Sequence, residues 1–402
     1  MKGTKAVAGM NIKRVFGICM AFVLCAFVCV SGASARTIYV PDDYEKIQWA
    51  VDHASAGDTI IVRDGTYTEN VVVDVAHLTI RSENGSASTT VSAAISNIHV
   101  FKINADYVNI SDFSVRGAKN AAGLYLEAIY CNISNSTCSN NFYGIYLENS
   151  SNNTISNNIC TNNEWGIYSW GSNNILSNNT CTNNTYVGIY LWYSEKNFVS
   201  NNNCSNNGIG IYLYYKSNNN TLENNNVSAN GDGIRLYNSL NNKIGNNNVS
   251  NNDFGIYLQK SLNNNIENNT ANLNNWNGIH LLDSQNNKIE SNNASNNFYG
   301  IKLYNSSDII IEGNNVNSNN EYGIRLEYSL NNRLSKNNVL NNTYGISLAF
   351  SDNNIIYNNN FINNTYNAHS SYSTNIWNST EKITYTYRGS KFTNYMGNYW
   401  ID

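Results

Sequence analysis

Short apolar phrases recur along most of this chain at a spacing of 21 to 23 residues. Each phrase opens with a glycine, and the glycines of the series are Gly123, Gly144, Gly166, Gly188, Gly210, Gly233, Gly255, Gly278, Gly300, Gly323 and Gly345. Apolar residues follow one, three and about eleven positions later, as Ile145, Leu147 and Ile155 follow Gly144. Because apolar and polar residues alternate within each phrase, the pattern predicts short, half-buried β-strands.

One repeat has room for three short strands and three bends. Such a unit cannot bury its apolar side alone, so it must stack on copies of itself. The pattern therefore predicts an all-β fold, a single-stranded parallel β-helix with one coil per repeat of 22 to 23 residues. We expect right-handed coiling, because crossovers between parallel strands are almost always right-handed.

Asparagine makes up about a fifth of the chain, whereas only 13% of the residues are charged. One column of asparagines lies about nine residues after the glycine: Asn153, Asn174, Asn197, Asn220, Asn242, Asn264, Asn287, Asn332 and Asn354. A second lies about fourteen residues after it: Asn158, Asn179, Asn202, Asn225, Asn247, Asn269, Asn292, Asn314, Asn337 and Asn359. We expect both columns at bends, where asparagine tolerates the left-handed conformation. Stacked amides can donate to one neighbour and accept from the other, which predicts asparagine ladders.

Four cysteines share one column, about sixteen residues after the glycine, with small apolar residues such as Val227. These are Cys138, Cys160, Cys181 and Cys204. The favoured interpretation is buried thiols that pack as small hydrophobic groups. Disulfides between adjacent coils are the alternative, although parallel Cβ vectors would have to bend toward each other. No metal site is predicted, because no histidine shares the column.

The N-terminus has the pattern of an export signal over residues 1–35, with basic residues, an apolar run over 15–30 and small residues before Arg36. An uncleaved membrane anchor is the alternative interpretation. The net charge of −4 provides no basic surface for nucleic acid. We expect a secreted, periplasmic or cell-surface protein that acts as a monomer.

The two ends depart from the repeat. Residues 36–66 predict an N-terminal cap with a helix at 47–54, capped by Asp42 or Asp43, and a first strand at 59–62. Residues 67–365 hold the β-helix coils, the early ones looser than the rest. Residues 366–402 are richer in Thr, Tyr and Lys and predict one or two antiparallel strands that close the far end.

Two columns of residues point outward on one predicted face, two and four residues after the glycine. The centre of this face is aromatic and comprises Trp170, Tyr190, Trp192, Tyr212, Tyr214 and Tyr237. Flat apolar rings with polar tips suit the faces of sugar rings along an extended glycan. The alternative is structural, because aromatic residues also fill exposed strands for the sake of cross-strand pairs.

Two charged clusters on the same face are candidates for catalysis. Glu127 and Glu148 lie on adjacent coils, at a separation that suits the carboxylate pair of a retaining glycosidase. Lys302 and Arg325 lie near three further titratable residues, His280, Asp283 and Glu327. Such a group would abstract a proton and neutralise a uronate in a lyase. Solvated surface charges produce the same neighbours, so a non-catalytic protein is the favoured interpretation.

The units YGIYLENSSNNTISNN and FGIYLQKSLNNNIENN resemble the repeats of the NosD-type family of periplasmic copper-binding β-helix proteins. The leading segment TIYVPDDYEKIQWAVDHASAGDTIIVRDGTYTENV and the ending YTYRGSKFTNYMGNYW are also similar, so the resemblance covers roughly residues 37–402. It implies the fold of the broader pectate-lyase-like superfamily, which hosts many functions. In the family GNYW runs on into a stretch rich in Asp and Gly, which implies that this chain is truncated at Asp402.

The favoured function is therefore an exported, non-catalytic surface protein whose aromatic face binds extracellular polysaccharide or surface glycan, or which serves as a structural module. A polysaccharide lyase or glycoside hydrolase is the second interpretation. The third, implied by the resemblance alone, is an accessory protein for maturation of a periplasmic copper enzyme. The residues themselves predict no cofactor, because the histidines are scattered and methionines are few.

Overall fold

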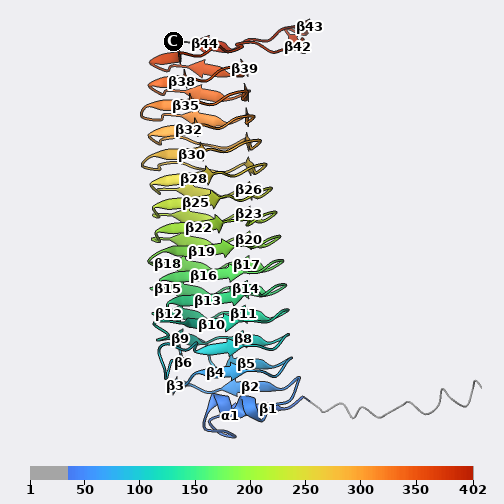
Figure 1. The fold of residues 1–402 in the computed structure, drawn as a ribbon, viewed down its shortest axis with the longest axis vertical. Coiled ribbons are helices and arrows are strands. Elements are labelled where there is room, and N and C mark those ends of the chain that lie inside the picture. Colours follow the sequence, from blue (N-terminus) through green and yellow to red (C-terminus); the bar gives the residue numbers. More distant parts are fainter. Residues whose placement is uncertain (1–34, 402) are drawn as a thin grey trace, which may run out of the picture. The chain divides into compact units, whose positions relative to one another are not determined.

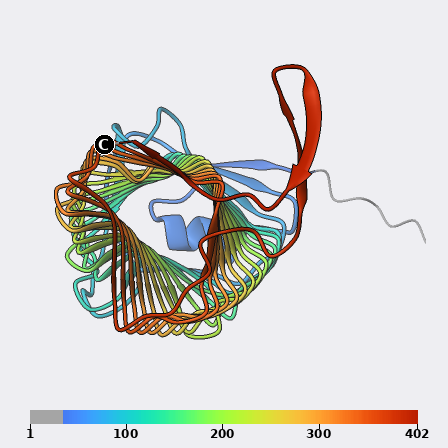
Figure 2. The same cartoon turned by 90° about the horizontal axis from the view of Figure 1, so that it is seen from above.

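The computed structural model of the protein describes residues 35–401, and from Thr37 onward these form one compact unit, a parallel β-solenoid (Figure 1). All but the last residue of the predicted signal peptide lies outside the described residues. Viewed along its axis, the unit is a stack of closely superposed coils (Figure 2). The predicted all-β parallel β-helix is confirmed.

Most coils contribute to three parallel sheets, although the third sheet has only isolated bridges at Thr270 and Asn293 between Ser250 and Asn315. The first has 15 strands, in the order β1 (Thr37–Val40), β2 (Thr59–Val62), β5 (Thr79–Ser82), β8 (Asn109–Ser111), β11 (Asn132–Ser134), β14 (Thr154–Ser156), β17 (Ile175–Ser177), β20 (Phe198–Ser200), β23 (Thr221–Glu223), β26 (Lys243–Gly245), β29 (Asn265–Glu267), β31 (Lys288–Glu290), β33 (Ile310–Glu312), β36 (Arg333–Ser335) and β39 (Ile355–Tyr357). The second has 14 strands, β4 (Val71–Val73), β7 (Phe101–Ile103), β10 (Ala122–Leu126), β13 (Tyr143–Glu148), β16 (Trp165–Trp170), β19 (Val187–Trp192), β22 (Ile209–Tyr214), β25 (Asp232–Tyr237), β28 (Phe254–Gln259), β30 (Asn277–Leu282), β32 (Tyr299–Tyr304), β35 (Tyr322–Glu327), β38 (Tyr344–Ala349) and β41 (Tyr366–Ser371). The third is split into two runs. The first run has nine strands, β3 (Gly65–Thr68), β6 (Thr89–Ser92), β9 (Ser114–Arg116), β12 (Thr137–Ser139), β15 (Ile159–Thr161), β18 (Thr180–Thr182), β21 (Asn203–Ser205), β24 (Asn226–Ser228) and β27 (Asn248–Ser250). The second run has four strands, β34 (Asn315–Asn317), β37 (Asn338–Leu340), β40 (Asn360–Ile362) and β44 (Tyr399–Ile401).

Pairing between neighbouring coils places equivalent residues of successive repeats directly over one another. Ile145 pairs with Ile167, which pairs with Ile189, and all three are fully buried. Columns of this kind fill the interior with Ile, Leu and Val, so the core runs the length of the solenoid. The apolar periodicity of the sequence is therefore the inward-facing half of each strand.

The predicted asparagine ladders are present, and the amides in them accept through Oδ1 and donate through Nδ2, with an interruption at Ile309 in the first ladder. The backbone N–H and the Nδ2 of Asn202 both donate to Oδ1 of Asn225 at 3.0 Å, and Nδ2 also donates to the carbonyl of Leu176 at 2.9 Å. The left-handed conformation was assigned to the wrong residues. It belongs to the residue before each ladder asparagine, such as Asn201 and Asn224, both with φ of 56°.

A third asparagine ladder, which the sequence did not predict, runs along the solenoid. Its members are Asn141, Asn163, Asn184, Asn207, Asn230, Asn252, Asn274, Asn297, Asn319, Asn342 and Asn364, and all are buried. It lies beside the repeat glycines. A Cβ on Gly166 would lie 2.4 Å from the carbonyl oxygen of Gly188 and 3.0 Å from Nδ2 of Asn184, so only glycine fits there. Close approach of the coils, rather than a left-handed φ, therefore explains the glycine of the repeat.

The cysteine column is a stack of free thiols. Cys138, Cys160, Cys181 and Cys204 are paired in register on β12, β15, β18 and β21, and all four are fully buried. The thiol of Cys160 and burial raise the pKa of Cys138 well above its usual value. The favoured prediction of buried thiols is confirmed.

The N-terminal end holds a single described helix, α1 (Ile47–Asp52), which is neither long nor apolar enough to span a membrane. Ile47, Ala50 and Val51 are buried, as their spacing predicts. At six residues, α1 is a short helix that packs against β1, β2 and β4, and the predicted capping helix is not evident among the described residues. The first strand was also misplaced, because β1 precedes the helix and pairs in parallel with β2.

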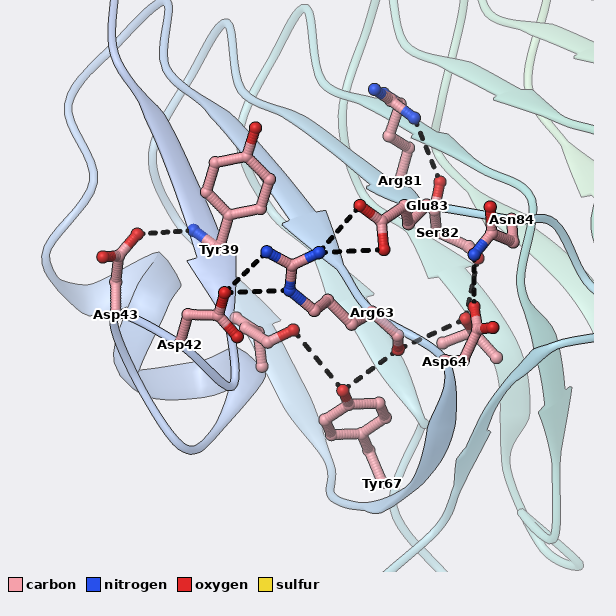
Figure 3. Close-up of polar contacts among 12 residues, drawn as sticks. Tyr39, Asp42, Asp43, Arg63, Asp64, Tyr67, Arg81, Ser82, Glu83 and Asn84 are labelled. Atoms are coloured by element: carbon pink, nitrogen blue, oxygen red, sulfur yellow. Dashed lines mark hydrogen bonds and ion pairs between the residues drawn. The ribbon is translucent and has the colours of Figure 1, made fainter.

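The predicted helix caps were wrong. Lys46 occupies the N-cap position of α1 without a side-chain hydrogen bond. Asp42 instead forms an ion pair with Arg63 at 2.6 Å, and Arg63 also reaches Glu83 at 2.9 Å (Figure 3). Asp43 accepts a hydrogen bond from the backbone N–H of Tyr39 at 2.7 Å. Both aspartates therefore stabilise the loop that follows β1.

The C-terminal segment differs from its prediction. Two antiparallel strands exist, β42 (Ile383–Tyr387) and β43 (Ser390–Asn394), but this hairpin projects sideways instead of closing the end (Figure 1, Figure 2). The last coil is formed by β41 and β44, which pair in parallel with β38 and β40. The hairpin is therefore an expanded bend within a final coil.

Candidate functional site

The outward residues of the 14-stranded sheet form one continuous face, as predicted. We call the residues two and four positions after each repeat glycine the outer face. Parallel pairing sets Tyr168 over Tyr190 and Tyr212 over Arg235. In the second column, Glu148 lies over Trp170 and Trp192 over Tyr214.

The six aromatic residues predicted to bind carbohydrate lie together on this face. We call them the aromatic strip: Trp170, Tyr190, Trp192, Tyr212, Tyr214 and Tyr237. The ring centroids of Trp170 and Trp192 are 5.2 Å apart, and those of Tyr190 and Tyr212 are 5.4 Å apart. The rings of Tyr214 and Tyr237 stack at 5.3 Å with an interplanar angle of 16°. Mutual contact holds the rings in place before any ligand arrives.

Five rings of the aromatic strip are half-buried, and Tyr190 is only 8% exposed. Burial raises the pKa of Tyr212 to about 12, although the guanidinium of Arg235 acts in the opposite direction. Burial likewise raises the pKa of Tyr190. These hydroxyls stay protonated at neutral pH and are available as donors and acceptors.

A third outward column, the residue just before each repeat glycine, was missed by the sequence analysis. Trp165 belongs to it and lies 5.0 Å from Tyr190 between ring centroids. Tyr143 lies 4.8 Å from Tyr146 in the same way. The recurrence of Tyr, Trp or Phe at this position was visible in the sequence. Simple alternation, counted back two residues from the inward Ile145, places Tyr143 inward, whereas Gly144 and Ile145 are both buried and Tyr143 lies outward.

The carboxylates of Glu127 and Glu148 meet at one tyrosine. The hydroxyl of Tyr125 donates to Glu148 at 2.6 Å and lies 3.4 Å from a carboxylate oxygen of Glu127. Tyr125 is only 6% exposed, and burial, followed by the hydrogen bond to Glu148, raises its pKa. The structure thus brings the two predicted glutamates together through a buried phenol.

Two further residues beside this pair were missed, because they lie on coils that precede the glycine repeat. His99 stacks on Tyr125 at 4.1 Å, and its Nδ1 accepts the backbone N–H of Ala122 at 2.9 Å. The Nζ of Lys102 lies 5.8 Å from the same ring. Burial and then Lys102 lower the pKa of His99, so the imidazole is neutral at neutral pH.

The second charged cluster is an ion-pair network. Lys302 lies 3.3 Å from Glu327, and Arg325 donates to the other oxygen of that carboxylate. Arg325 also covers the ring of Tyr322 at 4.3 Å. Burial acts to raise the pKa of Glu327, but the two cations lower it below its usual value. Both cations therefore share a single carboxylate, which offsets only one of the two positive charges.

The other two residues of this predicted cluster separate. His280 lies next to Lys302 in register and stacks on Tyr257 at 4.9 Å with an interplanar angle of 7°. Asp283 lies in the bend after β30, where it accepts a hydrogen bond from Asn305 at 2.7 Å. Only His280 shares the surroundings of the two cations.

Copper, which the family resemblance implied, does not fit the donors present. Among residues 35–401, no group of three or more His, Cys, Asp or Glu side chains is arranged to hold a metal ion. The four stacked thiols lie in an apolar core without an imidazole, and burial disfavours the thiolate that binds copper. No step through copper follows from these residues.

Comparison with known families agrees with this architecture. Residues 214–402 match the family described as periplasmic copper-binding protein (NosD), and residues 122–261 match the right handed beta helix region. The two matches overlap and together cover the glycine repeats. They confirm the resemblance inferred from the repeat units.

A cell surface glycoprotein of Methanothermus fervidus is 38% identical over 113 residues, which are 27% of this chain and 18% of that protein. The chain thus spans less than a fifth of that relative. Among solved structures, the Dettilon tailspike protein has a TM-score of 0.60 at 17% identity, over 75% of this chain and 67% of that one. PfbA, a surface adhesin of Streptococcus pneumoniae, has a TM-score of 0.45 at 12% identity, over 90% of this chain and 98% of that one.

At 17% identity, the likeness to the Dettilon tailspike protein is informative about the fold alone. The family matches, the parallel register and the repeated coil agree with one another along the chain. The described residues therefore form a parallel β-helix, and residues 214–402 of this chain are similar to the NosD family.

Proposed function

We propose that this protein is exported and binds extracellular carbohydrate along its outer face. The main support for this proposal is the aromatic strip, a run of mutually packed, half-buried rings on successive coils. Support for a surface location comes from the export pattern of residues 1–35 and from the distant cell surface glycoprotein relative. A purely structural surface module is the competing role.

The geometry of the strip suits a ligand that runs along the solenoid axis. The rings are fixed by their neighbours, so binding costs little side-chain entropy. Tilted pairs such as Trp170 and Trp192, at 51°, leave parts of the ring faces open to a sugar. The tyrosine hydroxyls add hydrogen bonds at the rim. An extended polysaccharide would meet equivalent partners at each coil, about 4.8 Å apart.

A glycan array with wild-type protein and the Trp192→Ala variant tests the proposal. Trp276→Ala is the matched control, because Trp276 is 52% exposed, lies outside the aromatic strip and contacts Phe298 instead. We expect Trp192→Ala to weaken binding about tenfold, the effect of losing about 1.4 kcal/mol. Equal binding by both variants, or no binding by wild type, would assign the strip to structure alone.

The pair of glutamates favours a second candidate function, cleavage of a polysaccharide. Glu127 and Glu148 share the hydroxyl of Tyr125, so two carboxyl groups flank one outward site. Release of reducing ends or unsaturated products from acidic polysaccharides would reveal such an activity. It should disappear in Glu148→Gln, whereas Lys302→Ala tests the second cluster independently. Turnover that persists in Glu148→Gln would exclude this pair.

A further inference from the structure

Beside the outer face, the column of residues just before the repeat glycines contains a groove about 470 Å³ in volume, between Trp165 and Phe254. Here the column before the repeat glycine changes from aromatic to aliphatic, with Val187 and Ile209 in the places of larger rings. We call this depression the central groove. Tyr212 of the aromatic strip lines it, so the groove opens directly beside the proposed binding surface. Its volume lies in the usual range for small-molecule sites.

Two glycines outside the repeat series, Gly208 and Gly231, line the groove. A Cβ on Gly208 would lie 2.7 Å from the carbonyl oxygen of Tyr186, and one on Gly231 would lie 2.7 Å from that of Gly208. Both positions are therefore closed to any side chain unless the backbone moves. Backbone at these two glycines therefore forms part of the groove wall, and side chains such as Trp165 and Phe254 form the rest.

An ion pair borders the groove. Arg235 donates from Nη1 to Asp232 at 3.0 Å, and its guanidinium carbon lies 5.4 Å from the ring centroid of Tyr212 and 5.1 Å from that of Tyr257. The buried Nε of Arg235 has no hydrogen-bond partner among the described residues. The guanidinium is thus held between two rings with a donor still unused.

The charges around the groove disfavour an anionic ligand. Asp232 and Asp253 both line it, whereas Arg235 is the one cation that does. Burial raises the pKa of Asp232, an effect that Arg235 only partly offsets, so this carboxylate has lost part of its hydration. Ligand hydroxyls that replaced the lost water would be strong partners for it.

We propose that the central groove is a subsite for one neutral sugar ring, an inference that rests on the proposed function. Trp165, Tyr212 and Phe254 supply apolar contact for the ring, Asp232 accepts from its hydroxyls and Arg235 donates to them. The same acidic surroundings reject uronates. The groove therefore makes the aromatic face selective for neutral over acidic polysaccharide.

Calorimetric titration of the full chain with laminarin and mannan as neutral probes, and with alginate and polygalacturonate as acidic ones, tests this selectivity. We expect at least tenfold tighter binding of a neutral probe than of either acidic one. Tighter binding of an acidic probe would overturn the subsite while leaving carbohydrate binding intact. Failure of all four probes, together with an empty glycan array, would overturn the proposed function itself.

Two variants locate the effect. Ile209→Trp fills the groove from a half-buried outward position, and Ile175→Trp is its matched control on the 15-stranded sheet, where Ile175 is 43% exposed. We expect Ile209→Trp to lose neutral binding at least tenfold and the control to retain it. Asp232→Asn keeps the shape but removes the charge, and should weaken neutral binding and relieve the rejection of uronates. Wild-type affinities in both groove variants would place the ligand elsewhere, and melting curves show whether each variant is folded.

Discussion

The inward and outward residues of the same strands behave differently along the solenoid. Inward, Ile145, Ile167 and Ile189 repeat almost without change. Outward, the neighbouring column passes from tyrosine through Arg235 and His280 to Lys302. The interior is constrained by close packing and by hydrogen bonds that fix one residue type per column. The exterior needs only residues that tolerate a β-strand, so it is the part that is free to acquire a binding function.

The strongest way to break the interior is to add one carbon atom at a repeat glycine. A Cβ on Gly233 would lie 2.4 Å from Cγ1 of Val249 and 2.6 Å from the carbonyl oxygen of Gly255. Because both neighbours belong to the packed core, we expect Gly233→Ala to lower the free energy of unfolding by more than about 3 kcal/mol. Denaturant unfolding followed by circular dichroism measures the loss.

Gly245→Ala is the control for that substitution. At Gly245 a Cβ would have its nearest neighbours at 3.6 Å, an ordinary contact, and φ is not left-handed. We expect no loss, or a gain of up to about 1 kcal/mol from the smaller entropy of the unfolded chain. Similar losses in both variants would show that coil spacing is not what selects glycine in the repeat.

A ladder asparagine is the next most sensitive site. Asn225 is 1% exposed, its Oδ1 accepts two hydrogen bonds from Asn202, and its Nδ2 donates to Val199 and Asn247. Asn225→Ala leaves buried donors and acceptors without hydrogen-bond partners, so we expect the free energy of unfolding to fall by about 2–3 kcal/mol. The exposed neighbour Asn224 has φ of 56°, and Asn224→Gly should change stability by less than about 0.5 kcal/mol. Equal losses would mean that bend conformation, not the ladder, is what the asparagines supply.

The regular interior explains how much of the fold could be predicted. A period of 22 to 23 residues is visible because identical surroundings select identical residues, as with Gly144 and Gly166. The third ladder escaped notice because asparagine occupies almost every position of the bends, so Asn163 does not stand out. Strand β1 and the C-terminal hairpin were misjudged because both lie outside the glycine series, where no phase fixes the register.

The candidate site was predictable in its columns but not in its contacts. Parallel register sets Trp192 over Tyr214 whatever their rotamers, so membership of the outer face follows from the period. The hydrogen bond from Tyr125 to Glu148 depends on side-chain conformation, which no spacing encodes. The central groove is lined partly by Gly208 and Gly231, which lie outside the repeat series.

His280 tests the charged part of the outer face through pH. Burial, followed by the nearby Lys302, lowers the pKa of His280 from 6.5 to about 4, and neither ring nitrogen has a hydrogen-bond partner among the described residues. Between these two pH values the unfolded chain binds the proton that the folded chain excludes. The free energy of unfolding should therefore fall by about 1–3 kcal/mol as the pH drops through this window.

His280→Phe keeps a ring to stack on Tyr257 and removes the titrating group. We expect this variant to lack that component of the pH dependence in denaturant unfolding between pH 7 and pH 4. His53 is the control, because it is exposed next to α1 and bonded through Nδ1 to the carbonyl of Trp49. An unchanged pH profile in His280→Phe, or the same change in His53→Phe, would contradict burial of a neutral imidazole on the outer face.

We expect the smallest loss in free energy of unfolding at the aromatic strip. This loss decides whether inward residues contribute more to stability than outward ones. Tyr237 is half-buried and stacks on Tyr214, so Tyr237→Thr keeps a strand-forming residue and should cost less than about 1 kcal/mol. Leu236, one residue earlier, is fully buried, and Leu236→Thr should cost at least about 3 kcal/mol. If unfolding experiments gave equal losses, the rings would be holding the coils together, and the strip would need no ligand to explain it. If Tyr237→Thr lowers the free energy of unfolding much less than Leu236→Thr does, stability does not explain the aromatic strip. Ligand binding is then the better explanation for its rings.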